Sequence, residues 1–315
     1  MIKELESIEF KGDIHKEEDI SAIASFNRFL VIGSDETKKK IQVLKKIEDN
    51  SYKVSHDIKL PVSEGSDKEE FDIEGMEIGK DNTLFVIGSH SLKRKKVKPE
   101  KTYEENRERI ATVEPEDKRN RIFKLTLDSE TGELNGSIES INIKETILQD
   151  KVLKIFTQIP SKENGIDIEG IAVDGDQLYL GFRGPVLRLN YVPVVVTKFD
   201  NPSDYEIRYV NLGGNGIRDL TQVKDGFLMI SGPVGDGEGS YQLYFWDGSD
   251  SIPGRDKQKE AQISLLGKIP SPRGAKAEGI TVMEEISSVY KVIIVYDGLP
   301  NGAATLFQVT KPALS

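Results

Sequence analysis

Five copies of one short pattern of polar and apolar positions run along the chain. The copies are Asp19-Ile-Ser-Ala-Ile23, Asp72-Ile-Glu-Gly-Met76, Asp167-Ile-Glu-Gly-Ile171, Gly216-Ile-Arg-Asp-Leu220 and Lys276-Ala-Glu-Gly-Ile280. After a short polar turn, each copy is followed by an apolar run that ends in small or polar residues, namely Phe29–Ser34, Leu84–Ser89, Leu178–Gly181, Phe227–Gly232 and Val292–Asp297. Short apolar runs on both sides of a turn predict β-hairpins.

The spacing of the copies predicts a β-propeller. The motif starts are 53, 95, 49 and 60 residues apart, and all but the longest spacing match one four-stranded blade. The longest gap contains a charged insertion at about residues 92–120. A sixth blade built from Glu145–Ile159 is the alternative, although Glu145–Phe156 is more typical of a short amphipathic helix. A third apolar run often follows the hairpin, as at Arg121–Leu127, Val186–Leu189 and Tyr241–Trp246.

The two ends of the sequence predict how the ring closes. The last repeat supplies only three strands, the third at Thr305–Thr310, while Ile2–Phe10 is a spare strand ahead of the first motif. Pairing the spare strand into the last blade would remove an exposed sheet edge. We therefore predict an all-β protein: a single propeller domain over residues 1–315, with five blades, closed by its N-terminal strand and carrying the insertion at about residues 92–120.

Composition narrows the partners and excludes several kinds of site. The net charge of −10 disfavours attraction to nucleic acid or to an anionic membrane surface. The absence of cysteine excludes a disulfide framework, a thiolate zinc site and a cysteine nucleophile. No apolar stretch approaches the length of a spanning helix, and the first residues lack the apolar region of a secretory signal. We expect a cytoplasmic protein with no nucleic-acid or membrane partner.

Four runs of sequence resemble a known bacterial family. They are Asp72-Ile-Glu-Gly-Met76 with Gly88-Ser-His-Ser91, Asn164–Gly170 with Gly181–Arg188, Gly216–Leu220, and Glu278-Gly-Ile280 with Tyr296-Asp-Gly298. They look like domain-of-unknown-function family 3616, and the match extends over most of the chain. This resemblance implies a propeller-like fold and no assigned activity. More distantly, the Asp-x-Glu-Gly element is similar to the family labelled esterase-like activity of phytase, which implies a hydrolase.

The hairpin geometry gathers the repeated residues on one face. The start of the first strand of an antiparallel hairpin lies beside the end of the second, so all five corners should meet around the channel mouth. The corners are Asp19 and Ser21 beside Ser34 and Asp35, Asp72 and Glu74 beside Ser89 and His90, Asp167 and Glu169 beside Arg183, Arg218 and Asp219 beside Ser231, and Lys276 and Glu278 beside Asp297.

These corners suit metal-assisted chemistry on a small anion. Carboxylates from Asp72, Glu74, Asp167, Glu169 and Glu278 are candidate ligands for Ca²⁺, Mg²⁺ or Mn²⁺. Arg183 and Arg218 are candidate substrate-binding residues, because a guanidinium holds an anionic group in a bidentate manner. Glu74, Glu169 and His90 are the candidate catalytic residues, with His90 as general acid or base. The function predicted is a metal-assisted hydrolase of a small anionic ester.

Two alternatives stay open. The motif carboxylates could instead cap backbone amides or pair with arginines across blades, and the glycine of Glu-Gly could serve only close blade packing. The insertion combines the basic run Lys93–Lys96 with a predicted helix at Tyr103–Ala111, and it leaves the same face as the carboxylates. It could be a lid, an anion-steering arm or a solvated loop, or it could dock a protein partner, in which case the protein is a non-catalytic scaffold or sensor.

Overall fold

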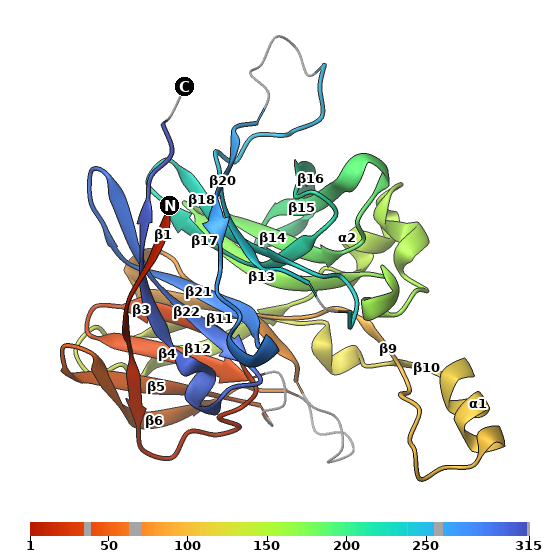
Figure 1. The fold of residues 1–315 in the computed structure, drawn as a ribbon, viewed down its shortest axis with the longest axis horizontal. Helices are drawn as coiled ribbons and strands as arrows, with labels where there is room; N and C mark the ends of the chain where they lie inside the picture. The colour runs from red at the N-terminus through yellow and green to blue at the C-terminus, as the bar shows by residue number, and fades with distance from the viewer. Residues whose placement is uncertain (35–38, 63–70, 238, 255–260, 314–315) are drawn as a thin grey trace.

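Each repeated motif lies at the start of the innermost strand of an antiparallel sheet in the computed structural model (Figure 1). The structure describes residues 1–34, 39–62, 71–237, 239–254 and 261–313, so the predicted corner residue Asp35 lies outside the described residues. The innermost strands are β3 (Ile20–Phe26), β7 (Ile73–Ile78), β13 (Asp167–Asp174), β17 (Gly216–Val223) and β21 (Lys276–Glu285). Each of these strands contacts the next, and β21 contacts β3, so the five sheets form a closed ring. The fold is the predicted five-bladed propeller.

The remaining strands follow in the same order within each blade. The second strands are β4 (Phe29–Ser34), β8 (Thr83–Gly88), β14 (Gln177–Gly184), β18 (Gly226–Gly232) and β22 (Val289–Asp297). The third strands are β5 (Lys40–Glu48), β11 (Ile122–Leu127), β15 (Tyr191–Lys198), β19 (Gln242–Trp246) and β23 (Thr305–Thr310). The outer strands are β6 (Ser51–Lys59), β12 (Leu134–Ile141), β16 (Asn201–Asn211), β20 (Ile263–Lys268) and β1 (Ile2–Ser7).

The N-terminal strand closes the ring as predicted. β1 pairs antiparallel with β23, from Ile2 opposite Val309 to Ser7 opposite Thr305. In Figure 1 this red strand lies among the blue strands of the last blade. The short strand β2 (Glu9–Lys11) then pairs with β6 of the first blade. The segment therefore ties the last blade to the first and covers two sheet edges.

One local prediction was wrong, and one alternative is excluded. The third strand of blade three is β15, and not Val186–Leu189, because the chain turns at Leu189 and Asn190, where φ is 64° and 63°. The β-branched run after this turn forms the strand instead. Residues 142–166 contain no strand, which excludes a sixth blade there.

The helix predicted at Glu145–Phe156 is broken into two pieces. These are α2 (Lys144–Gln149) and the 3₁₀ turn η3 (Leu153–Phe156). Asp150 ends the first piece, and its carboxylate accepts hydrogen bonds from the backbone N–H groups of Val152 and Leu153 at 2.8 and 2.9 Å. The other 3₁₀ turns are η1 (Lys80–Asn82), η2 (Asp117–Arg119), η4 (Ser161–Glu163), η5 (Arg188–Asn190), η6 (Pro272–Gly274) and η7 (Pro300–Ala303).

The charged insertion is a two-stranded stalk that carries a helix. Its strands β9 (Leu92–Arg94) and β10 (Val113–Pro115) pair antiparallel. The helix α1 (Tyr103–Ala111) begins at a capping box, in which Thr102 and Glu105 satisfy each other's backbone N–H groups. This helix matches the predicted one and stands away from the blades in Figure 1.

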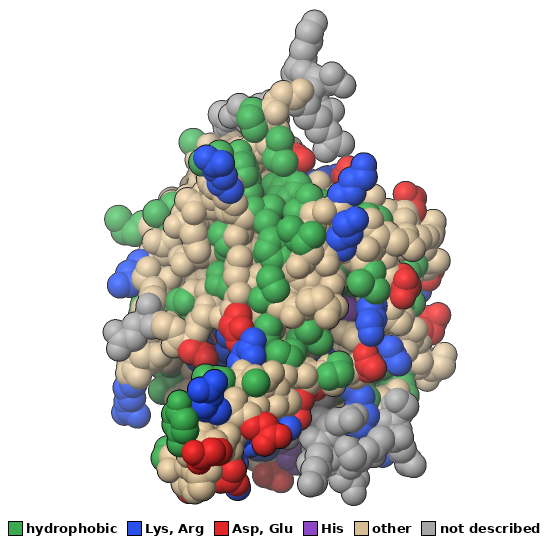
Figure 2. Space-filling model, turned by 90° about the vertical axis from the view of Figure 1, so that its right-hand side faces the viewer, with side chains coloured by type: hydrophobic (Ala, Val, Ile, Leu, Met, Phe, Trp, Pro, Cys, Tyr) green, Lys and Arg blue, Asp and Glu red, His purple; other side chains and the backbone are tan. Residues whose placement is uncertain are grey.

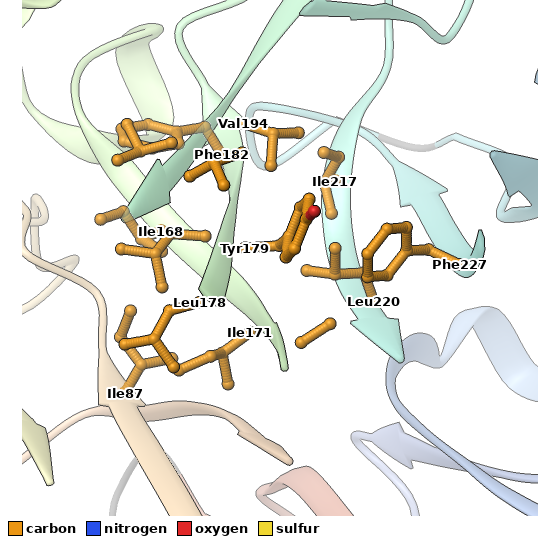
Figure 3. Packing of buried hydrophobic residues seen from close by; sticks show 14 of the residues in the cluster. Ile87, Ile168, Ile171, Leu178, Tyr179, Phe182, Val194, Ile217, Leu220 and Phe227 are labelled. Carbon is orange, nitrogen blue, oxygen red and sulfur yellow. The ribbon is translucent and has the colours of Figure 1, made fainter. Parts of the chain in front are cut away.

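The hydrophobic core lies between neighbouring blades. Figure 3 shows Tyr179 of blade three beside Leu220 and Phe227 of blade four, while Ile171 and Leu178 lie on the side of Ile87 in blade two. The motif glycine permits this close approach: a Cβ at Gly170 would lie 2.9 Å from the backbone nitrogen of Leu220. In the part of the chain that the structure describes, no helix combines the length and apolar character needed to cross a membrane. The cytoplasmic location stays a prediction.

Candidate functional site

A β-bulge occurs at the central motif position of every inner strand. The pairing between inner and second strands shifts between Ile20 and Ala22, Ile73 and Gly75, Ile168 and Gly170, Ile217 and Asp219, and Ala277 and Gly279. The skipped residues are Ser21, Glu74, Glu169, Arg218 and Glu278. A bulge leaves one residue outside the regular pairing and re-aims its side chain. The local backbone thus turns one variable side chain per blade toward its neighbours around the channel.

Three arginines connect most of the carboxylates. Arg183 pairs with Asp167 and, at 2.6 Å between Nη1 and Oε1, with Glu169 of its own blade. Arg218 of blade four bridges two blades, because its Nε lies 2.9 Å from Oε2 of Glu169 and its Nη2 pairs with Glu278 of blade five. All five side chains are at least nine-tenths buried. The alternative in which motif carboxylates pair with arginines across blades is therefore present in the structure.

The third arginine comes from the insertion and was missed by sequence reasoning. Arg119 in η2 donates to Oδ2 of Asp72 at 2.6 Å, and its Nε pairs with Glu116. Ser89 donates to the same Asp72 oxygen at 2.8 Å. The signal in the sequence is a basic residue near the point where the insertion rejoins blade two. The basic run at the start of the insertion is the stronger charge pattern of the two.

Glu74 differs from the other motif carboxylates. In the described part of the chain it forms no ion pair with a basic side chain, whereas Asp72, Asp167, Glu169 and Glu278 each do. Glu74, Asp167 and Glu169 each offer a carboxylate oxygen within 4.8 Å of the other two. Burial raises the pKa of Glu74 well above its usual range, and the nearby charges of Asp72, Glu169 and Asp167 raise it further. Burial also raises the pKa of Asp167, against the opposing effect of Arg183.

These groups face one cavity of about 370 Å³, which we call the mouth cavity. Its acidic and arginine walls come from Asp72, Glu74, Arg119, Asp167, Glu169, Arg183 and Glu278. The stalk of the insertion supplies another wall, with Lys93 and Lys96 among its residues. Lys162 and Lys276 border the cavity too. Lys162 pairs with Asp236 at 2.8 Å, and Lys276 pairs with Asp297. The basic run thus lies over the carboxylates, on the face predicted for it.

Other motif residues hold neighbouring blades together. The carboxylate of Asp219 accepts hydrogen bonds at 2.8 Å from the backbone N–H groups of Leu220 and of Ile280 in the next blade. Ser21 donates to the carbonyl oxygen of Ile73 in blade two. Arg218 belongs with these residues, because it does not line the mouth cavity and both carboxylates that it contacts are buried. The ring is therefore a latch between blades as well as the wall of a cavity.

His90 faces a different cavity. It lines a space of about 360 Å³ between the stalk of the insertion and α2, which we call the side cavity. Ser91 lines both spaces, whereas Glu74 and Glu169 line only the mouth cavity. The structure thus brings together all the predicted metal-ligating residues and Arg183, and places His90 beside them in a separate pocket.

Comparisons with known proteins bear on the family and the fold. The family model described as protein of unknown function (DUF3616) matches residues 19–304. The Dos1 propeller has 13% identity and a TM-score of 0.37 over 89% of this chain, which spans 56% of the length of that chain. Sqt1 of Saccharomyces cerevisiae has 8% identity and a TM-score of 0.36, covering 97% of this chain and 99% of that one. The GH43 β-1,3-galactosidase BT3683 with galactodeoxynojirimycin has 12% identity and a TM-score of 0.46, covering 98% and 94%. No curated protein matches the sequence.

Proposed function

Because the chain belongs to the DUF3616 family of proteins of unknown function, we propose a function from the site itself: the mouth cavity binds a small anionic ligand together with a divalent cation. Glu74 carries the proposal, since its close polar neighbours are other carboxylates and it has no basic partner in the described part of the chain. Buried carboxylates are ordinarily paired, protonated or bound to a metal ion. Oxygen ligands from Glu74, Asp167 and Glu169 suit Ca²⁺, Mg²⁺ or Mn²⁺.

The anionic ligand is supported by the basic groups around the same cavity. Arg183 lines the cavity, and its buried Nε has no hydrogen-bond partner among the described residues. Lys93 and Lys96, from the insertion, line the same cavity. A bound cation together with these basic side chains would neutralise a ligand that carries a phosphate or carboxylate group.

Hydrolysis of a small anionic ester is the finer form of this proposal. A bound divalent cation would polarise an ester oxygen and lower the pKa of a bound water. Glu74 is then the candidate to accept a proton, and Arg183 the candidate to hold the anionic group. Arg218 acts as a positioning residue for Glu169 and Glu278. The alternative function is a non-catalytic scaffold or sensor that docks a protein partner on the insertion.

Thermal unfolding with and without divalent cations tests the proposal. Chelator-treated protein is melted alone and with Ca²⁺, Mg²⁺ or Mn²⁺, as wild type, as Glu74→Gln and as Glu284→Gln. Glu284 is a matched control, because it is an exposed carboxylate on blade five that pairs with Lys291 at 2.7 Å and does not line the mouth cavity. A cation at one hundred times its dissociation constant stabilises a protein by about 2.7 kcal/mol.

We expect that stabilisation in wild type and in Glu284→Gln, and its loss in Glu74→Gln. Without cation, Glu74→Gln should be at least as stable as wild type, since it removes a partly buried carboxylate that has no basic partner among the described residues. If no cation raises the melting temperature of wild type, or if Glu74→Gln responds as wild type does, the cation site is wrong. Turnover of p-nitrophenyl phosphate in the stabilising cation, lost in Glu74→Gln, then separates hydrolysis from binding alone.

A further inference from the structure

The side cavity has mostly apolar walls from three parts of the chain. The stalk contributes Leu92 and Val113, α2 contributes Ile147 and Leu148, and Ile166 comes from the segment that leads into β13. Its volume of about 360 Å³ lies within the range of small-molecule pockets, which combine apolar walls with a few polar groups. Figure 2 shows this side of the molecule, where hydrophobic side chains gather above the charged insertion.

His90 gives the cavity a defined hydrogen-bonding group. Its Nδ1 lies 2.8 Å from the carbonyl oxygen of Gly88. Because a carbonyl only accepts, Nδ1 carries the proton and Nε2 is left as an acceptor. His90 is only 7% exposed, and its buried Nε2 has no hydrogen-bond partner in the described part of the chain. A buried acceptor without a partner is unusual in folded proteins and is a reason to look for a ligand.

The backbone holds His90 at this place under strain. Its φ of 53° lies in the left-handed region, which is uncommon for residues other than glycine, although asparagine, aspartate and histidine adopt it more often than the others. Its N–H donates to the carbonyl oxygen of Arg119 at 3.3 Å, so the end of the insertion fixes the residue. Strained residues kept by their surroundings concentrate at functional sites.

The charges around the side cavity are already balanced. Lys144 and Asp117, both lining residues, pair at 3.1 Å. Glu116 pairs with Arg119. Burial lowers the pKa of His90 to about 4, so the imidazole is neutral at physiological pH. Nothing in these pairs calls for a charged ligand.

We infer that the side cavity is a second ligand site, which binds a small neutral molecule with an apolar body and a hydroxyl group that donates a hydrogen bond to Nε2 of His90. The site needs neither the cation nor the anion of the mouth cavity. Ser91 lies on the wall between the two cavities, so they are neighbours with opposite preferences.

A matched pair of small molecules tests the inference. The two compounds are 4-methylphenol and p-xylene, which differ by the replacement of one hydroxyl with a methyl group. The full chain is labelled with ¹⁵N at its three histidines, and the ring nitrogens are followed by NMR during titration. An ordinary apolar pocket prefers p-xylene, because it is the less polar compound. We expect 4-methylphenol to bind at least tenfold tighter and to shift the Nε2 signal of His90, with His15 and His56 unchanged.

Three variants assign the site. His90→Asn suits the left-handed backbone and removes the imidazole acceptor, so it should lose the preference for 4-methylphenol. Leu148→Trp fills the cavity from α2 and should lose binding, whereas Ile155→Trp, an exposed position outside the cavity, should bind as wild type does. If His90→Asn fails to fold, the tryptophan pair still decides the location. Equal or tighter binding of p-xylene, unchanged binding by Leu148→Trp, or no binding up to the solubility of either compound would overturn the inference.

Discussion

Replacing Arg218 by methionine separates the latch role of the ring from its role as a cavity wall. Arg218 is only 3% exposed, and its guanidinium is the one contact described between Glu169 of blade three and Glu278 of blade five. Methionine fills a similar space but leaves both carboxylates without this partner. Removing one partner of a buried ion pair typically costs about 3–5 kcal/mol. With about 2.1 cal/mol/K of unfolding entropy per residue, a loss of about 4 kcal/mol corresponds to about 6 °C in a chain of 315 residues.

The assay is thermal and urea unfolding followed by the fluorescence of Trp246, the only tryptophan, which is fully buried on β19. Lys276→Met is the control, because Lys276 pairs with Asp297 at the rim with 47% of its side chain exposed and should contribute less than about 1 kcal/mol. Adding Glu169→Gln and Glu278→Gln to Arg218→Met should restore at least half of the lost stability, since it removes the negative charge that Arg218 no longer offsets, although Glu169 still contacts Arg183.

Acid should rescue the Arg218→Met variant in part. Without the arginine, Glu278 is a buried carboxylate that has lost its described ion pair, and its charged form is what costs stability. Protonation removes that charge, so stability is retained at low pH and lost as the pH rises. The gap from wild type should therefore narrow as the pH falls toward 5. A loss no larger than that of Lys276→Met, or one unaffected by the two glutamine substitutions, would refute the latch.

Four further outcomes are expected. Burial lowers the pKa of His90 to about 4 from 6.5. The free energy of unfolding of wild type should therefore fall by up to about 3 kcal/mol between pH 6.5 and pH 4, and His90→Asn should not show this loss. Urea titrations of the two proteins at both pH values would show or exclude the difference. Gly170→Ala should lower the unfolding free energy by about 1–3 kcal/mol, since its Cβ would meet Leu220, while Gly237→Ala, with no atom within 4 Å, should melt as wild type does. Deleting residues 1–7 uncovers the edge of β23 and should lower the melting temperature and promote association, visible by light scattering; an unchanged monomer would contradict the closure by β1. Replacing residues 96–111 by a short glycine-serine link should shift the melting temperature by less than about 2 °C, because α1 contacts its own stalk through Arg94 and Arg109. A deletion that extends through residue 120 should destabilise the walls of the mouth cavity, because it also removes Arg119, the partner of Asp72.

The blades were predictable because hairpin spacing is a local property of the sequence. The five motifs, the hairpins after them and the spare N-terminal strand all depend on short apolar runs and turn residues. The third strand of blade three was placed too early because Val186–Leu189 and Tyr191–Lys198 are both apolar runs, and the turn at Leu189 and Asn190 that separates them has no strong sequence signal.

The sequence predicts which residues form the candidate site better than it predicts the ion pairs between them. Corner geometry placed Asp167 beside Arg183 because the two residues lie at the same end of one hairpin. Pairing between blades, as of Arg218 with Glu278, depends on side-chain reach across a packed interface, which a single sequence does not encode locally. His90 was expected at the mouth from its place in the hairpin corner, but its left-handed backbone sets it against the side cavity.

The bulge in each inner strand also bears on how this ring can be altered. A bulged residue is not matched to a partner across the sheet, so a substitution there leaves the register of the blade intact. Positions 21, 74, 169, 218 and 278 already hold serine, glutamate and arginine on five closely similar hairpins. The five bulged positions therefore accept side chains of different charge without a change in the fold of the blade. Substituting acidic and basic residues at these positions in compensating pairs is a direct route to a propeller of this shape that binds a different ligand.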